Sequence, residues 1–222
     1  QLASNENNIV AFKDQGEYNL ITHEGIIISP SEWFSFVKQL TPNVAAIKHI
    51  NNARINFITG TGSYLLPRDV LNYRVLDNQA NPNYALIEVR RGLWNIINLK
   101  TGAILLRKPV ADIMLSNKYG HGIFVKKTID DAWEQIDVKG KTIFKLANNN
   151  PDTKPLTNIG NVALVKDNKN ILSVINTTNS RTLWKKKYRN VADVYVIGNS
   201  FIIQDNDLKI YDIVSPNGEL ID

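Results

Sequence analysis

The plan of this chain is clearest in the stretch Gly92-Leu93-Trp94-Asn95-Ile96-Ile97-Asn98-Leu99-Lys100-Thr101-Gly102. It begins near a large apolar residue, Trp94, continues through a short apolar run and closes on Gly102. Five further segments share this plan, and they are residues 18–25, 55–62, 133–140, 172–179 and 211–218. The openers Trp94, Trp133, Leu172 and Tyr211 follow one another at intervals of 39 residues. A fixed period of this length indicates a repeat architecture.

Each repeat predicts a set of short antiparallel strands. Before the opener lies an apolar run of strand length, such as Tyr84–Val89 or Val162–Val165. A polar turn such as Arg90-Arg91-Gly92 separates that run from the opener, so we expect a hairpin there. The closing Gly or Asn suits a tight turn with positive φ. A third apolar run follows the turn, for example Ala103–Leu106.

The segments that lead from one repeat to the next are expected to differ. Ser31–Lys38 and Asp69–Leu76 predict short helices, because apolar residues return at helical spacing behind a residue that can cap a helix. Val110–Leu115 and Val191–Ile197 instead predict a fourth strand. Asn148–Pro155 predicts a turn-rich loop.

One sheet of this size cannot bury both of its faces, whereas several copies can stack on one another. The sequence therefore predicts an all-β repeat architecture of about six units, most consistent with a β-propeller of about five or six blades. An open, curved array of the same sheets is the alternative. We expect a single domain over residues 1–222, and its approximate units are 8–43, 44–83, 84–121, 122–161, 162–200 and 201–222.

Two of these stretches carry a resemblance to a known family. Residues 92–102, and Glu17–Gly25 followed by Ile28–Phe34, resemble the WG-type repeats of bacterial surface and secreted proteins and of phages that infect the same hosts. The motif of that family is a Gly, a one-residue gap, Trp-Gly, two apolar residues, Asp and a turn Gly. Here the Gly after the Trp is replaced by Asn95 or Glu134. The resemblance implies a β-rich repeat array without a shared activity, and it favours an extracytoplasmic or virion-associated location over the cytoplasm.

Composition limits the classes of function. The chain has 222 residues with 26 Lys and Arg against 21 Asp and Glu, a net charge of +5, and no Cys. The basic excess is spread over both halves, unlike the concentrated patch of a typical nucleic-acid-binding protein. No apolar run approaches the roughly 18 residues that a membrane-spanning helix needs. The lack of Cys excludes thiol nucleophiles, iron–sulfur clusters and cysteine-ligated zinc.

No catalytic or metal-binding motif stands out, so we predict no enzyme activity, no metal and no cofactor. The histidines His23, His49 and His121 stand at unrelated offsets, with no paired ligand nearby in sequence. Lys139–Thr142 ends like a phosphate-binding loop but lacks the first Gly of that motif. Asp205–Asp207 begins like a calcium loop but lacks its Gly and its final Glu. Both are expected to be hairpin turns.

The strongest local candidate for binding is the basic run at residues 181–189, which has five cations and two aromatic residues. On a strand, alternate side chains point to opposite faces, so Trp184, Lys186 and Tyr188 would share one face. The run is either a site for an anionic partner or an edge strand whose lysines prevent unwanted pairing. The candidate partner-binding residues are Arg181, Trp184, Lys185, Lys186, Lys187, Tyr188 and Arg189.

These observations together predict a non-enzymatic interaction or structural scaffold that meets another protein, as a component of a bacterial surface or phage virion assembly. The alternative is a β-propeller that binds a carbohydrate or polyanion. That alternative includes activity on glycans, because propeller glycosidases gather carboxylates from several blades and show no linear motif. Trp94 and Trp133 recur once per repeat and are expected to be packing residues rather than a sugar-binding platform. The oligomeric state stays open.

Overall fold

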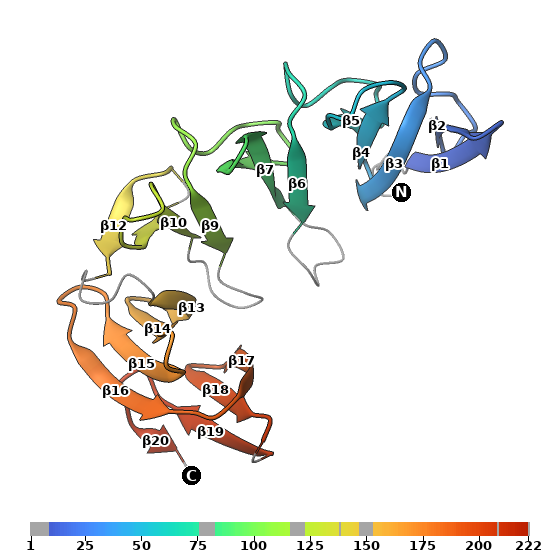
Figure 1. The fold of residues 1–222 in the computed structure, drawn as a ribbon. Coiled ribbons are helices and arrows are strands. Elements are labelled where there is room, and N and C mark those ends of the chain that lie inside the picture. Colours follow the sequence, from blue (N-terminus) through green and yellow to red (C-terminus); the bar gives the residue numbers. More distant parts are fainter. Residues whose placement is uncertain are drawn as a thin grey trace, which may run out of the picture. The chain divides into compact units, whose positions relative to one another are not determined.

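The computed structural model describes residues 9–75, 83–115, 123–137, 139–146, 153–207 and 209–221. Within these residues it contains 20 strands in five antiparallel sheets and no helix, as Figure 1 shows. The predicted all-β class and the repeat of small sheets are confirmed. The chain divides into two compact units, residues 1–109 and residues 110–222.

The first unit, blue to green in Figure 1, holds two sheets. One has the order β1-β2-β3-β4-β5, and its strands are β1 (Ile9–Asp14), β2 (Glu17–Thr22), β3 (Phe34–Thr41), β4 (Val44–His49) and β5 (Asn56–Thr59). The other has the order β6-β7-β8, and its strands are β6 (Asn72–Val75), β7 (Tyr84–Arg90) and β8 (Leu93–Asn98). β2 and β3 share a single residue pair, Tyr18 with Phe34, so the first sheet consists of two smaller ones joined at one point.

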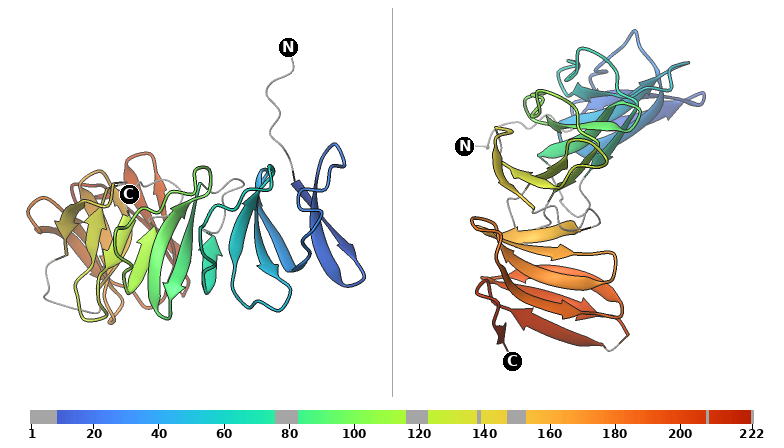
Figure 2. Two further views of the ribbon diagram at one scale, coloured as in Figure 1. Left: turned by 90° about the horizontal axis from the view of Figure 1, so that it is seen from above. Right: turned by 60° about the vertical axis from the view of Figure 1, so that its left-hand side comes forward.

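The second unit, residues 110–222, holds three four-stranded sheets. The first has the order β12-β11-β10-β9, with β9 (Asp112–Leu115), β10 (Ile123–Lys126), β11 (Glu134–Ile136) and β12 (Thr142–Lys145). The second contains β13 (Lys154–Ile159), β14 (Val162–Lys166), β15 (Ile171–Asn176) and β16 (Thr182–Lys187). The third contains β17 (Val191–Ile197), β18 (Ser200–Asp205), β19 (Ile210–Val214) and β20 (Leu220–Ile221). Figure 2 shows the last two sheets, orange and red, stacked face to face.

Stacking explains why the strands read as uninterrupted apolar runs. In β14, Val162 and Leu164 pack with residues of the β17–β20 sheet in one core cluster, which includes Phe201. The alternate residues Ala163 and Val165 pack with the β9–β12 sheet in another. A strand buried on both faces loses the polar alternation of a half-exposed strand, because both sets of side chains contribute to a core.

The two predicted helices are wrong. In the predicted helix Ser31–Lys38, strand β3 begins at Phe34. In the predicted helix Asp69–Leu76, residues Asn72–Val75 form strand β6. Apolar spacing in such short segments fits a helix and a strand almost equally well, and pairing with β4 and β7 outweighs the local preference. Asp69 caps no helix and instead accepts hydrogen bonds from the side chains of Asn52 and Asn56.

The remaining connecting segments agree with the sequence more closely. The strands predicted at Val110–Leu115 and Val191–Ile197 are confirmed as β9 and β17, and each pairs with the hairpin that follows it. Within the predicted loop Asn148–Pro155, residues 148–152 lie outside the described residues. The loop prediction is wrong at Lys154 and Pro155, which begin β13. Pro155 is tolerated there because β13 is an edge strand of its sheet.

A polar residue directly after each opener ties the third run to the hairpin in the first unit. The Oδ1 atoms of Asn19, Asn56 and Asn95 each accept a hydrogen bond from the next residue's N–H, at 2.7–2.8 Å. Their Nδ2 groups donate to main-chain carbonyls at 2.9–3.2 Å, and these belong to Ser29, Leu66 and Leu106. The third runs of this unit make only single bridges, such as Ile97 with Ile104, so these amides supply bonds that a longer strand would otherwise make.

The closing glycine of a repeat lies against the main chain of the preceding repeat. Gly102 has a φ of +72°, and a Cβ added there would lie 2.7 Å from the carbonyl oxygen of Leu65. At Gly218 the corresponding distance, to Leu183 O, is 2.6 Å. These glycines therefore meet two requirements, a left-handed backbone conformation and close approach of two chain segments.

Candidate binding surface

The predicted basic run forms strand β16 and the residues beside it. β16 is an edge strand of its sheet, and among the described residues it pairs only with β15. Lys185, Lys187 and Arg189 are exposed, and so is Arg181 in the turn before the strand. None of these four cations is in an ion pair with another described residue. An exposed edge with unpaired cations fits an anionic partner as well as it fits a guarded edge.

The opposite face of β16 holds two sheets together. Lys186 Nζ lies 2.7 Å from Oδ2 of Asp212 on β19, and the hydroxyl of Tyr188 donates a hydrogen bond to the same carboxylate. Burial, followed by this hydrogen bond, holds the pKa of Tyr188 well above its usual range. The half-buried Trp184 lies beside Tyr188, with ring centroids 6.4 Å apart. The shared face is as predicted, and its role is to join the β13–β16 and β17–β20 sheets.

A hollow of about 620 Å³, which we call the side hollow, lies at the end of β16. Its lining residues come from the turn between β14 and β15 and from the end of the basic run, and they are Asn168, Lys169, Asn170, Lys187, Tyr188 and Arg189. Two of the cations predicted from the sequence, Lys187 and Arg189, thus line the same hollow as Lys169, which the sequence analysis did not identify.

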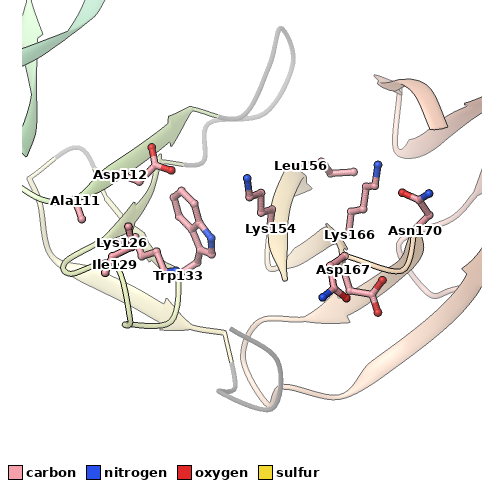
Figure 3. Close-up of a pocket in the computed structure, with 11 residues that line it drawn as sticks. Ala111, Asp112, Lys126, Ile129, Trp133, Lys154, Leu156, Lys166, Asp167 and Asn170 are labelled. Atoms are coloured by element: carbon pink, nitrogen blue, oxygen red, sulfur yellow. The ribbon is translucent and has the colours of Figure 1, made fainter. Parts of the chain in front are cut away.

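A larger cleft of about 710 Å³ lies between the β9–β12 and β13–β16 sheets, both of which belong to residues 110–222. Figure 3 shows Trp133 and Lys126 on one side of it and Lys154 and Lys166 on the other. The described residues that line it are Ala111, Asp112, Lys126, Ile129, Trp133, Lys154, Leu156, Lys166, Asp167, Asn168 and Asn170. Since the last two residues also line the side hollow, the two adjoin.

The two carboxylates of the cleft hold the backbone beside them. Oδ1 of Asp167 accepts hydrogen bonds from the N–H groups of Lys169 and Ile171, both at 2.9 Å. Oδ1 of Asp112 accepts one from Ile113 N–H, also at 2.9 Å. In Figure 3 they stand on opposite sides of the cleft, with Trp133 and Lys154 between them. This arrangement gives no support to a pair of carboxylates acting together as acid and base.

Glu134 is a deeply buried carboxylate with two lysine partners, and it stands at the position after the opener Trp133. Its side chain is 2% exposed and lies 2.8 Å from the ammonium groups of Lys127 and Lys145. Thr142 also donates to it, at 2.8 Å. Burial alone would raise the pKa of Glu134, but the hydrogen bonds from Lys127, Lys145 and Thr142 outweigh it and lower the pKa to about 2. The Glu134 carboxylate therefore has a structural role. It occupies the same position in its repeat as Asn95, directly after the opener.

Of the two described histidines, one lies in a turn and one packs between aromatic rings, and the two motif-like segments form hairpin turns. His23 lies in an exposed turn as predicted, His49 packs between Phe34 and Tyr64, and His121 lies outside the described residues. Among the described residues, no group of three or more His, Asp or Glu could hold a metal ion. Lys139–Thr142 and Asp205–Asp207 lie at the β11–β12 and β18–β19 hairpins, which confirms both turn predictions.

The two tryptophan openers are core residues, as predicted. Trp94 is 9% exposed and Trp133 is 4% exposed. The guanidinium of Arg74 stacks over the ring of Trp94 at 4.4 Å. Trp133 packs with Phe124 and Phe144, so it lines one side of the cleft with little exposed ring surface for a ligand.

The sequence missed the three lysines of the cleft because they lie far apart along the chain. A signal was nevertheless present. Lys126 ends β10 and Lys166 ends β14, so both stand at the same place in successive repeats. A basic residue recurring at one repeat position is expected to produce a charged stripe when the repeats stack.

Comparison with known proteins finds similarity of fold alone. No protein-family model matches the chain, and no curated protein sequence is significantly similar to it. Among solved structures, Hsv2 of Kluyveromyces lactis has a TM-score of 0.50 at 11% identity, over 96% of this chain and 71% of that one. BamB of Moraxella catarrhalis has a TM-score of 0.49 at 14% identity, over 96% of this chain and 69% of that one. The WD40 β-propeller domain of Doa1 has a TM-score of 0.43 at 11% identity, over 98% and 78%.

The class of protein follows from the sheets and the repeats. This is an all-β protein built from repeated small antiparallel sheets, with a fold similar to that of Hsv2. In the parts of the chain that the structure describes, no helix is long and apolar enough to cross a bilayer.

Proposed function

We propose that this chain is a non-enzymatic scaffold that binds an acidic surface of another protein. One observation carries the proposal, namely that the two adjoining hollows gather cations without ion-pair partners among the described residues. We call this set the basic surface, and it consists of Lys126, Lys154, Lys166, Lys169, Lys187 and Arg189. The acidic residues of the same hollows are Asp112 and Asp167, and their carboxylates accept hydrogen bonds from main-chain N–H groups.

Protection of a sheet edge does not account for the basic surface. β16 is an edge strand, and lysines on it would discourage pairing with another chain. Lys126 and Lys166, however, lie on β10 and β14, which have a neighbouring strand on both sides. Cations there protect no edge, whereas they do create a positive potential that would steer an acidic partner toward the hollows.

We further propose that the scaffold belongs to a bacterial surface or phage virion assembly and works outside the cytoplasm. The support is the resemblance of residues 92–102 to WG-type repeats. Stacked repeats suit such a role, because they present extended surfaces whose stability does not depend on a bound ligand.

The test is affinity purification from the native source with two matched charge-reversal variants. Lys187→Glu/Arg189→Glu alters the basic surface, and Lys139→Glu/Lys141→Glu alters exposed lysines at the β11–β12 turn by the same charge. We expect the wild type and the control variant to retain the same partner protein, and the first variant to lose it. Recovery of the wild type alone, or equal retention by both variants, would refute the proposal, as would turnover of a substrate.

A polyanion-binding role is the second candidate, and the exposed cations of β16 favour it. A heparin column at physiological salt separates the two. We expect weak retention, because a site shaped for one acidic protein surface has a limited number of cations. Strong retention that Lys185→Glu/Lys187→Glu abolishes would replace the protein partner by a polyanion.

A further inference from the structure

The cleft between the β9–β12 and β13–β16 sheets carries an inference about the chemistry of the partner, and this inference rests on the proposed function. Its cationic side is unusual in one respect. Lys154 on β13 and Lys166 on β14 are directly opposite each other in the strand register. Figure 3 shows both side chains pointing the same way from their strands.

Like charges directly opposite on neighbouring strands destabilise a sheet. Neither Lys154 nor Lys166 has an ion-pair partner among the described residues, so no direct salt bridge in that part of the chain offsets their repulsion. Asp167 is adjacent in sequence, but its Oδ1 is engaged by two backbone N–H groups of the turn. A carboxylate placed between the two ammonium groups would remove the repulsion and gain two charge-assisted hydrogen bonds.

The cleft also has apolar residues on both sides. Ile129, which is 77% exposed, lies on the side of Trp133 and Lys126, and the half-buried Leu156 lies on the side of Lys154 and Lys166. An isoleucine this exposed at the rim of a hollow would gain from being covered by an apolar side chain of a ligand. The volume of about 710 Å³ falls within the range of about 300–1,000 Å³ that is usual for ligand pockets.

These features select among anionic ligands. Sugars are commonly bound by stacking on an exposed aromatic ring, but Trp133 is 4% exposed. Phosphate groups are favoured by the forked donors of arginine, and no arginine is among the described residues that line the cleft. An acidic peptide segment that includes a large apolar side chain fits this lining, because its carboxylates suit the lysines and its apolar side chain suits Ile129 and Leu156.

We propose that the cleft binds a short acidic segment of the partner protein. One large apolar side chain of that segment packs against Ile129, Leu156 and the edge of Trp133. A neighbouring Asp or Glu bridges Lys154 and Lys166, and Lys126 is placed for a second carboxylate.

The test uses a fluorescent peptide, Glu-Glu-Phe-Glu-Glu with blocked ends, and anisotropy as the readout. We expect binding to the wild type, and affinity lower by about tenfold or more for the same peptide with Ala in place of Phe. Lys154→Met/Lys166→Met should lose affinity by at least about tenfold, with Lys139→Met/Lys141→Met as the matched control. Ile129→Ser should weaken binding without affecting the fold, since Ile129 is exposed.

A second readout separates binding from structural effects. Because Lys154→Met/Lys166→Met removes a like-charge pair, its melting temperature should equal or exceed that of the wild type. The chain has four Trp residues, so its indole N–H signals are easily assigned by NMR. Peptide addition should move the signal of Trp133 and leave that of Trp94 unchanged.

Three results would overturn the inference. The first is that the wild type does not bind the peptide below about 1 mM, and the second is that Lys154→Met/Lys166→Met binds the peptide with the same affinity as the wild type. The third is that binding of heparin or inorganic phosphate depends on these two lysines more strongly than binding of the peptide does. The scaffold proposal fails separately. If Lys154→Met/Lys166→Met still retains the native partner and Lys187→Glu/Arg189→Glu does not, the partner binds the basic surface outside the cleft.

Discussion

Replacing Gly102 with Ala tests whether close contact between repeats, rather than turn geometry alone, requires glycine at the closing position. The control is Gly92→Ala, in the β7–β8 hairpin turn of the same unit. Gly92 has a φ of +69° and Gly102 a φ of +72°, but only at Gly102 does an added Cβ meet another segment, 2.7 Å from Leu65 O. Both variants incur the cost of a left-handed alanine, about 1–2 kcal/mol. Only Gly102→Ala also forces a main-chain displacement, which adds about 1–3 kcal/mol.

The assay is urea denaturation followed by tryptophan fluorescence, with unfolding free energies compared at equal m-values. Both substitutions lie in residues 1–109, so they affect the same unit. We expect Gly102→Ala to be less stable than Gly92→Ala by about 1–3 kcal/mol. Gly25→Ala should behave like Gly92→Ala, because Gly25 closes the first repeat and has no atom within 4 Å of its Cβ position. Equal losses for Gly102→Ala and Gly92→Ala, within about 0.5 kcal/mol, would refute the reasoning.

Three further predictions concern the buried polar ties. Since the pKa of Glu134 is lowered to about 2 in the folded chain from an ordinary 4.5, its contribution is complete above pH 4.5 and is lost as the pH falls toward 2. Acid titration of stability should show that Glu134→Gln is less stable than the wild type by about 1–3 kcal/mol at pH 7, and that the gap narrows over this window. Tyr188→Phe, which removes a donor to Asp212, should cost about 1–2 kcal/mol in thermal unfolding, whereas the 60% exposed Tyr211→Phe should cost almost nothing. Asn95→Ala should cost about 2–4 kcal/mol in urea, because it leaves buried main-chain groups of Ile96 and Leu106 without partners, and a cost below about 1 kcal/mol would contradict that account.

Periodicity predicted the strands well because its cause is local. The spacing of Trp94, Trp133 and the closing glycines reflects a hairpin and its tight turn, which involve residues close in sequence. The errors at Ser31–Lys38 and Asp69–Leu76 have the opposite origin. Those segments become strands because they pair with β4 and β7, and such pairing is invisible in a short apolar pattern.

The same distinction between local and long-range features holds for the candidate site. Alternation along β16 correctly predicted that Lys185 and Lys187 face water and that Lys186 and Tyr188 share the other face, although Lys186 is exposed as well. It could not reveal that Lys186 and Tyr188 share Asp212, which follows 24 residues after Tyr188. The cleft was missed for the same reason, since Lys126 and Lys154 lie on different sheets and come to line one cleft only when those sheets stack.

The contact between Gly102 and Leu65 also constrains how a chain of this kind can change its length. Gly218 meets Leu183 in the same way, and Gly62 approaches Ile28, so these closing turns fit a site on the repeat before them. Duplication or loss of one whole repeat would recreate that fit at the new junction. Insertion of a few residues between a closing glycine and the carbonyl it meets would place a different residue, with a side chain, at the point of closest approach. Such a gene can therefore grow or shrink readily only in steps of about 39 residues, and shorter insertions should be confined to the segments between repeats.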